Sequence, residues 1–251
     1  MSGSREATGR DHDGGRAPSD GAWQARASTR RHFGNGPLSQ GAALVYTLLV
    51  VELLILLTAL PGLVPLLLLT ADSSNIPLAA ACALPLGPAV SAALYALRRR
   101  SGDITDLHPA RAFWRGYRLN VLASLKVWVP GVAWLAVIGL NLANFGAADV
   151  PGWWAALLVA IAVATALWLG NALVITSLFS FRTVDIARLA LLFLARTPAV
   201  TLGNACLVAL AALLTAATSE VVLILLGSVF AFVLLLTSRR MITAIEEEFT
   251  A

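Results

Sequence analysis

Charged residues are scarce in this chain. Asp, Glu, Lys and Arg make up only 13% of its 251 residues, whereas soluble domains carry roughly 25%. Hydrophobic residues make up 58%, and the mean hydropathy is +0.79. A soluble chain of this length buries only part of its apolar surface on folding. The composition therefore excludes an ordinary soluble domain and predicts that lipid covers the excess.

Sequence motifs of catalysis and of metal binding are also missing. Lys126 is the only lysine and follows no glycine-rich loop, so the chain has no P-loop for nucleotide phosphates. Cys82 and Cys206 both lie in apolar stretches, where cysteine behaves as a small hydrophobic residue. The histidines are widely separated, at His12, His32 and His108. We therefore expect no catalytic residue, no metal, no cofactor and no enzymatic activity.

What the chain does have is a series of long apolar runs. Each is long enough for a helix across a bilayer core, which takes about 20 residues, with a range of roughly 17–25. None shows the alternating polarity of a barrel strand. The expected fold class is therefore all-α, a polytopic membrane helix bundle with six transmembrane helices within residues 38–240. The runs cover residues 42–69, 78–97, 119–142, 153–179, 199–217 and 221–237.

The two ends of the chain differ from this middle part. Residues 1–37 are rich in Gly, Ser, Arg and Asp and show no apolar periodicity, which predicts a disordered cytoplasmic tail. Residues 241–251 are expected to form a cytoplasmic C-terminal tail. Its acidic run at residues 246–248 is interpreted as solvated.

Prolines divide two of the apolar runs. Pro61 and Pro65 lie in the outer third of the first run, and proline removes a backbone donor and crowds the preceding turn. We therefore expect the first helix to end near Pro61, with residues 62–77 irregular or partly re-entrant. Pro85 and Pro88 lie in the second run, where we expect a kink or break whose freed carbonyl groups need partners from protein or water.

Basic residues are distributed unevenly among the connections. Arginines fill the connections between the second and third runs and between the fourth and fifth, whereas those near Asp72, Asp149 and Glu220 contain no Lys or Arg. Because cytoplasmic loops carry the excess of Lys and Arg, both ends are predicted to be cytoplasmic. We expect a multi-pass protein of the cell membrane, the inner membrane of a bacterium. Topology accounts for the net charge of +4, so no nucleic-acid partner is expected.

An aromatic and basic segment precedes the third run. On a helix, Arg111, Arg115 and Arg118 share one stripe. The aromatic side chains lie on the adjacent stripe: Phe113, Trp114 and Tyr117. Such a helix lies at the membrane interface, with rings in the acyl boundary and guanidinium groups at lipid phosphates. An anchor for the third helix is the simpler interpretation, and a docking surface for a cytoplasmic partner is the alternative.

Four polar residues inside the apolar runs are candidate site residues. Glu52 and Lys126 can reach similar depths from the cytoplasmic side, and a charge in the bilayer costs at least about 2.5–3.5 kcal/mol. We expect Glu52 to be protonated or paired, with Lys126 as its cationic partner. Asn171 and Asn204 join these candidates because asparagine hydrogen-bonds between membrane helices. The four form either helix–helix contacts, the simpler interpretation, or a site for ion coupling or a polar substrate.

Several patches of the chain match the pattern of one family. They are Val51 to Leu57, Leu60-Pro61, Leu86 to Ala89, Ala93 to Tyr95, Phe113 to Asn120 and Arg196 to Pro198. Together they resemble the YesL-like family of bacterial integral membrane proteins, which is defined by a domain of unknown function. The similarity spans residues 40–240. The chain departs from the family pattern at Glu52, where the family tends to have Asn, and carries extra residues between Pro61 and Gly87.

The resemblance implies a role in carbohydrate utilisation, because family members are often associated with components of sugar ABC transporters. It implies an accessory or regulatory membrane subunit, with the lipid bilayer and sugar ABC-transporter subunits as partners. The residues themselves leave two alternatives open. One is a stand-alone transporter or channel for a small solute or ion, which the proline-interrupted helices near Glu52 favour. The other is a membrane scaffold whose basic loops hold a cytoplasmic partner.

Overall fold

The computed structural model describes residues 37–70, 72–100, 108–147, 150–218 and 220–249. Within these ranges the backbone is almost entirely helical and contains no strand. The predicted disordered tail lies outside the described residues except for Pro37, where the first helix begins. The α-helices are α2 (Pro37–Leu68), α3 (Ile76–Cys82), α4 (Leu86–Arg98), α5 (Pro109–Ala143), α6 (Trp153–Leu178), α7 (Thr183–Arg196), α8 (Pro198–Ala217), α9 (Glu220–Leu225), α10 (Gly227–Thr237) and α11 (Arg239–Phe249), with short 3-10 turns η1 (Ser73–Asn75) and η3 (Phe145–Ala147).

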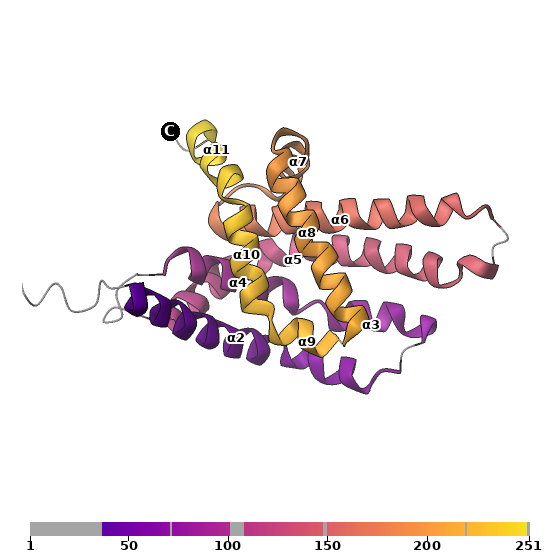
Figure 1. Ribbon diagram of the computed structural model, residues 1–251, viewed down its shortest axis with the longest axis horizontal. Helices are drawn as coiled ribbons and strands as arrows, with labels where there is room; N and C mark the ends of the chain where they lie inside the picture. The colour runs from indigo at the N-terminus through magenta and orange to yellow at the C-terminus, as the bar shows by residue number, and fades with distance from the viewer. Residues whose placement is uncertain (1–36, 71, 101–107, 148–149, 219, 250–251) are drawn as a thin grey trace, which may run out of the picture.

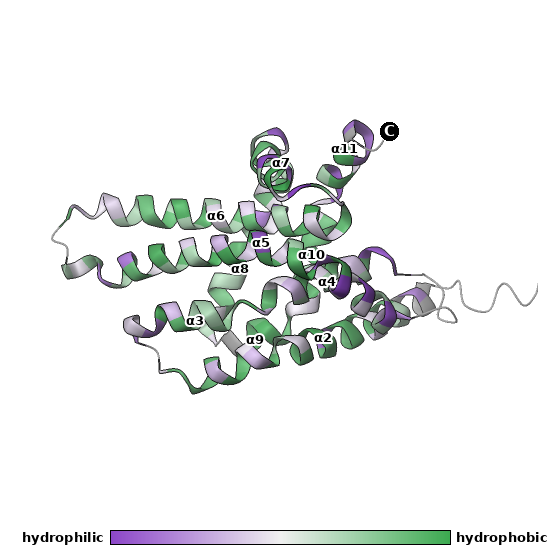
Figure 2. Cartoon of the chain, turned by 180° about the vertical axis from the view of Figure 1, so that it is seen from behind, coloured by the Kyte–Doolittle hydropathy of each residue, from purple (hydrophilic) through white to green (hydrophobic). Residues whose placement is uncertain are grey.

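Four helices, α2, α5, α6 and α8, are each long and apolar enough to cross a membrane. Two further pairs reach that length only together, across a bend: η1 and α3 with α4, at 43°, and α10 with α11, at 53°. The chain therefore has four candidate spans, or up to six if each bent pair is one span. Leu49, Leu53 and Leu68 are each more than 60% exposed, and apolar residues continue over the outer helix faces (Figure 2). This outward apolar surface and the purely helical backbone identify an all-α, multi-pass membrane protein.

The long helices and the C-terminal helices run in different directions. In Figure 1, α5 and α6 lie side by side along the long axis of the molecule, and α2 follows the same direction. The α8 and α10 helices cross them steeply, and α7 and α11 both lie beyond the same end of this crossing pair (Figure 1). The bundle is therefore not a parallel array of six equal helices.

Helix α4 lies at the centre and packs against α2, α5, α6 and α10. Nearly all of its residues from 87 to 97 are buried, and most of them are Gly, Pro, Ala or Ser. Small residues let helix backbones approach closely, which drives helix association in lipid. Gly87 makes one such close approach, since an added Cβ atom would lie 2.4 Å from the Cγ atom of Trp128 on α5.

The expected end of the first helix at Pro61 is wrong. Helix α2 continues through Pro61 and Pro65 to Leu68. Helix α3 packs against this outer part, since a Cβ atom on Gly62 would lie only 1.9 Å from the carbonyl oxygen of Cys82. Proline is tolerated in membrane helices where a neighbouring helix supports the backbone, and α3 provides that support here.

The expected break at Pro85 is confirmed. Helix α3 ends at Cys82 and α4 begins at Leu86. The carbonyl oxygen of Ala83, within the break, accepts a turn hydrogen bond from the N–H of Leu86 at 3.2 Å. It also accepts one from the indole N–H of Trp128, on α5, at 2.9 Å. A side chain of a neighbouring helix thus supplies the partner that a broken backbone needs in lipid.

The C-terminal segment that was expected to be a tail is helical and packs on the bundle, while its acidic run at residues 246–248 is exposed, as expected for a solvated segment. The buried face of α11 is formed by Met241, Ile242 and Ile245. Glu246 forms an ion pair with Arg98, and Glu248 forms one with Arg196, each at 3.0 Å. The acidic run therefore ties α11 to the ends of α4 and α7. Only three apolar residues mark the buried face of this amphipathic helix, and a run of glutamates follows them directly. The sequence pattern was therefore too short to predict the helix.

Candidate functional site

Glu52 lies beside an unexpected break in the last apolar run. The chain leaves helical geometry at Leu226, between α9 and α10, although no proline is near. The first N–H groups of a helix have no intrahelical partner, and Leu226 provides no side-chain cap. Glu52, from α2, accepts a hydrogen bond from the backbone N–H of Ser228 at 2.6 Å. The carboxylate therefore caps α10 from another helix, where the positive end of the helix dipole favours negative charge.

Lys126 is not the partner of Glu52, contrary to expectation. Lys126 is exposed and lines a surface groove together with Arg182 and Asp185, at the start of α7. The next residue, Val127, is the one that points into the bundle, with 3% of its surface exposed. Similar depth fixes the height of two residues in a membrane, but it does not fix the direction in which each side chain leaves its helix. Depth alone therefore assigned the wrong partner.

The two buried asparagines, Asn171 and Asn204, contact each other. The side-chain amide of Asn204 donates a hydrogen bond to Asn171 Oδ1 at 3.1 Å, and the hydroxyl of Thr237 donates to Asn204 Oδ1. Both asparagines are at most 3% exposed. This chain of hydrogen bonds joins α6, α8 and α10, which is the helix–helix contact that polar residues make in membranes.

The aromatic and basic segment forms the first turns of α5, so it is continuous with the third apolar run. The basic stripe is exposed along its whole length: Arg111, Arg115 and Arg118. Phe113 departs from the expected lipid contact, because it is fully buried against the core. Helix α4 covers this side of α5. Trp114 is 39% exposed, whereas Tyr117 is only partly exposed and stacks on Phe113.

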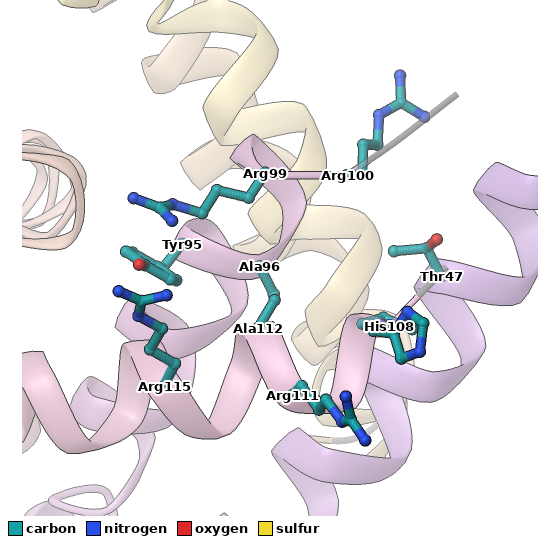
Figure 3. A pocket seen from close by; sticks show the side chains of 10 residues that line it. Thr47, Tyr95, Ala96, Arg99, Arg100, His108, Arg111, Ala112 and Arg115 are labelled. Carbon is teal, nitrogen blue, oxygen red and sulfur yellow. The ribbon is translucent and has the colours of Figure 1, made fainter. Parts of the chain in front are cut away.

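A pocket opens where the end of α4, the start of α5 and the first part of α2 meet (Figure 3). Its volume is about 500 Å³. We call it the basic pocket, because its lining among the described residues contains four arginines and one histidine but no carboxylate. These residues are Arg99, Arg100, His108, Arg111 and Arg115.

Tyr95 organises one wall of the basic pocket. The guanidinium group of Arg99 lies over its ring, 4.6 Å from the centroid, and the side chain of Arg115 lies on the other side of the ring (Figure 3). Gly116 makes room for this ring, since a Cβ atom there would lie 2.8 Å from Tyr95. A cation–π contact engages the face of a guanidinium group and leaves its N–H edges available to a ligand.

The arginines of the basic pocket have no anionic partner in the described part of the chain. No described carboxylate forms an ion pair with Arg99, Arg100, Arg111 or Arg115. Arg98, immediately outside the pocket, is neutralised by Glu246. Like charges gathered in one pocket repel one another, and a bound anion would offset that repulsion. The pocket is therefore suited to hold an anionic group.

Sequence reasoning found only part of the basic pocket. The predicted stripe contained Arg111 and Arg115, whereas Arg99 and Arg100 were used only to orient the helices. One signal was available. The connection between Arg100 and His108 is short, and short connections join antiparallel neighbouring helices. The end of one basic helix must therefore lie beside the start of the next.

Comparisons with protein-family models, with curated proteins and with solved structures found no significant match for this chain. The resemblance to the YesL-like family consequently stays an expectation based on the sequence patches. The bundle and the basic pocket are interpreted below from their own chemistry.

Proposed function

We propose that this protein is an accessory or regulatory component of an ABC-type carbohydrate uptake system in the cell membrane of a bacterium. The link to sugar uptake is supported by the resemblance to the YesL-like family alone. In the orientation expected from the arginine-bearing connections, with six spans and both ends inside, α7, α11 and the basic pocket face the cytoplasm. The proposed role is to dock a cytoplasmic or membrane subunit of the transporter on this side.

The observation that carries the docking role is the position of α7 and α11 at the same end of the bundle, linked by the ion pair of Arg196 with Glu248; we call these two helices the cytoplasmic platform. Ile186 and Phe193 bury α7 against the bundle, each with 1% of its surface exposed. Exposed ion pairs contribute only about 0–1 kcal/mol each, so the buried apolar faces supply most of the attachment and the two ion pairs fix the register of α11. Because this surface is already ordered, a partner can bind without ordering it first.

Co-purification in a mild detergent tests this proposal. The tagged protein is expected to retain a permease or ATPase subunit of a sugar ABC transporter, identified by mass spectrometry. The double variant Glu246→Arg/Glu248→Arg reverses the charges that fix the register of α11, so it should insert normally but retain much less of the subunit. Val150→Ser changes an exposed residue just before the start of α6; it is the control variant and should retain the subunit. Recovery of no transporter subunit with the parent protein would overturn the proposal.

A transporter for a small solute is the second candidate, and a cavity beside the start of α10 favours it. The cavity has a volume of about 290 Å³ and a mainly apolar lining that includes Asn204 and Gly227. The Oε1 atom of Glu52 would lie 3.6 Å from a Cβ atom on Gly227. This oxygen is buried and has no hydrogen-bond partner among the described residues.

An ionisable group at such a position in a membrane is a candidate for ion coupling. The two candidates separate on one measurement, uptake as a function of pH. If Glu52→Gln abolishes a pH-dependent uptake while the protein stays folded, transport is favoured over the accessory role.

A further inference from the structure

The basic pocket carries more positive charge than the packing of the bundle uses. Four guanidinium groups line it, from Arg99, Arg100, Arg111 and Arg115. Only part of this charge has a structural role: Arg99 lies on Tyr95, and Arg100 lies over the ring of Phe232 at 5.2 Å. Those contacts place the arginines but do not neutralise them. The described residues supply no anion that would neutralise these arginines.

The lining of the basic pocket favours a compact ligand with more than one negative charge. Arg99 and Arg115 flank Tyr95 on one side of the pocket, and Arg111, His108 and Thr47 lie on the other side (Figure 3). Cationic residues thus border the pocket on two sides. A volume of about 500 Å³ is within the range of small-molecule sites, roughly 300–1,000 Å³. This is ample for a headgroup or for a small phosphorylated molecule.

We infer that the basic pocket binds a phosphate-bearing ligand between the end of α4 and the first turns of α5. The planar fork of a guanidinium group matches phosphate oxygens with two parallel N–H donors. The first turn of α5 also lines the pocket and contains neither an acidic residue nor a side-chain cap. The positive end of this helix therefore adds to the attraction of the arginines.

Two sources can provide this phosphate chemistry. The pocket lies at the predicted cytoplasmic end of the bundle, where the headgroups of anionic phospholipids reside. The same opening also faces solutes of the cytoplasm. The inference rests on the membrane orientation used in the proposed function, but it is independent of the transporter subunit, because a purified protein suffices to test it.

The experiment uses the full chain in nanodiscs of phosphatidylcholine. One arm titrates inorganic pyrophosphate and measures binding by calorimetry. The other arm replaces part of the phosphatidylcholine with phosphatidylglycerol and measures the rise in the unfolding temperature. Saturable binding of pyrophosphate identifies a free ligand as a competent source. Stabilisation by phosphatidylglycerol that pyrophosphate does not reproduce identifies the lipid headgroup. Absence of both effects would overturn the inference.

Matched variants show whether the pocket itself is responsible. Arg99→Gln/Arg115→Gln removes two pocket charges and should weaken binding by roughly ten-fold or more. Arg118→Gln/Arg182→Gln removes two exposed charges outside the pocket and should change binding less than about three-fold. Without ligand, both variants should unfold no earlier than the parent, which shows that folding is intact. Equal losses in the two variants would assign binding to the general positive charge and overturn the inference.

The neighbouring connection supplies a last control. Asp103 and Asp106 belong to the segment between Arg100 and His108, outside the described residues. The double variant Asp103→Asn/Asp106→Asn should bind pyrophosphate with an affinity within a few-fold of the parent. If only this variant binds, the chain's own carboxylates fill the pocket, and the inference fails.

Discussion

Two helix breaks of this bundle, one between α3 and α4 and one between α9 and α10, are completed by opposite chemistry. In the first, a backbone carbonyl group needs a donor, and the indole N–H of Trp128 supplies it to Ala83. In the second, a backbone N–H group needs an acceptor, and Glu52 supplies it to Ser228. Both partners come from a neighbouring long helix. Each break is therefore a joint property of two helices.

The breaks differ in how they originate. Pro85 and Pro88 each lack a backbone N–H donor, so the first break has a signal in the local sequence, although α2 continues through Pro61 and Pro65. The second break has only Gly227 as a local mark, and glycine weakens a helix without ending it. Its carboxylate cap lies far away in the chain. The first break therefore has a local signal, whereas the cap of the second comes from another helix.

The largest expected effect concerns Gly87, next to the first break. Gly87→Ala should destabilise the protein by about 3 kcal/mol, because the new Cβ atom would lie 2.4 Å from Trp128 and displace it. Gly170→Ala is the control, since its Cβ atom would meet only Leu234, at 3.8 Å. That change should be neutral or slightly stabilising. Unfolding in detergent, followed by circular dichroism, measures the stability of both variants. A similar change in unfolding free energy for the two would contradict the close packing of α4 on Trp128.

The second break should respond to the loss of its cap. Glu52→Leu keeps a similar volume but leaves the N–H of Ser228 unsatisfied in lipid, so we expect a loss of about 2 kcal/mol. Glu52→Gln retains a carbonyl oxygen as an acceptor and should lose less than half as much. Hydrogen exchange at the start of α10 should rise in the leucine variant and stay low in the glutamine variant. Equal destabilisation by the two substitutions would show that the cap is not what matters at this position.

The first break should be less sensitive to its side-chain donor than the second. Trp128→Phe preserves a ring but removes the donor to Ala83, whose carbonyl oxygen still accepts from Leu86. We expect a loss of about 1 kcal/mol. Trp134→Phe, on the same helix and 53% exposed, should change stability by less than about 0.5 kcal/mol. If Trp128→Phe lowers the unfolding free energy more than Glu52→Leu does, the first break is the more sensitive one, contrary to the prediction.

The smallest expected effect is the coupling between Glu52 and Lys126. Because Lys126 lies in a surface groove and Glu52 caps α10, the variants Glu52→Gln and Lys126→Met should be additive within about 0.5 kcal/mol. A double-mutant cycle of unfolding free energies measures this coupling. A coupling above about 1 kcal/mol would restore the ion pair that the sequence predicted.

Local signals explain which parts of the fold were predictable. Helix class follows from run length and composition, the break at Pro85 from proline, and the exposed arginine stripe of α5 from helical periodicity. The continuation of α2 through Pro61 was not accessible, because it depends on the contact of Gly62 with α3. The helix at residues 239–249 was missed since its apolar face is short and adjoins a run of glutamates.

The candidate site was predictable only in its residue types. Periodicity placed Arg111 and Arg115 on an outer face, but it also grouped Phe113 with the lipid-facing rings, and only the packing of α4 shows that this ring is buried. The basic pocket adds Arg99 from another helix, and a single-helix pattern cannot join two helices. The same limit applies to Glu52, whose partner is a backbone group that no side-chain pattern records.

The position of α11 along the chain has a consequence for biosynthesis. Arg98 and Arg196 are translated before the glutamates that neutralise them, so both arginines remain available while the last helices emerge from the ribosome. The contacts of α11 can form only after α11 has been made. A chain that stops after α10 would lack both ion pairs and the buried contacts of Met241, Ile242 and Ile245, so this end of the bundle would stay uncovered.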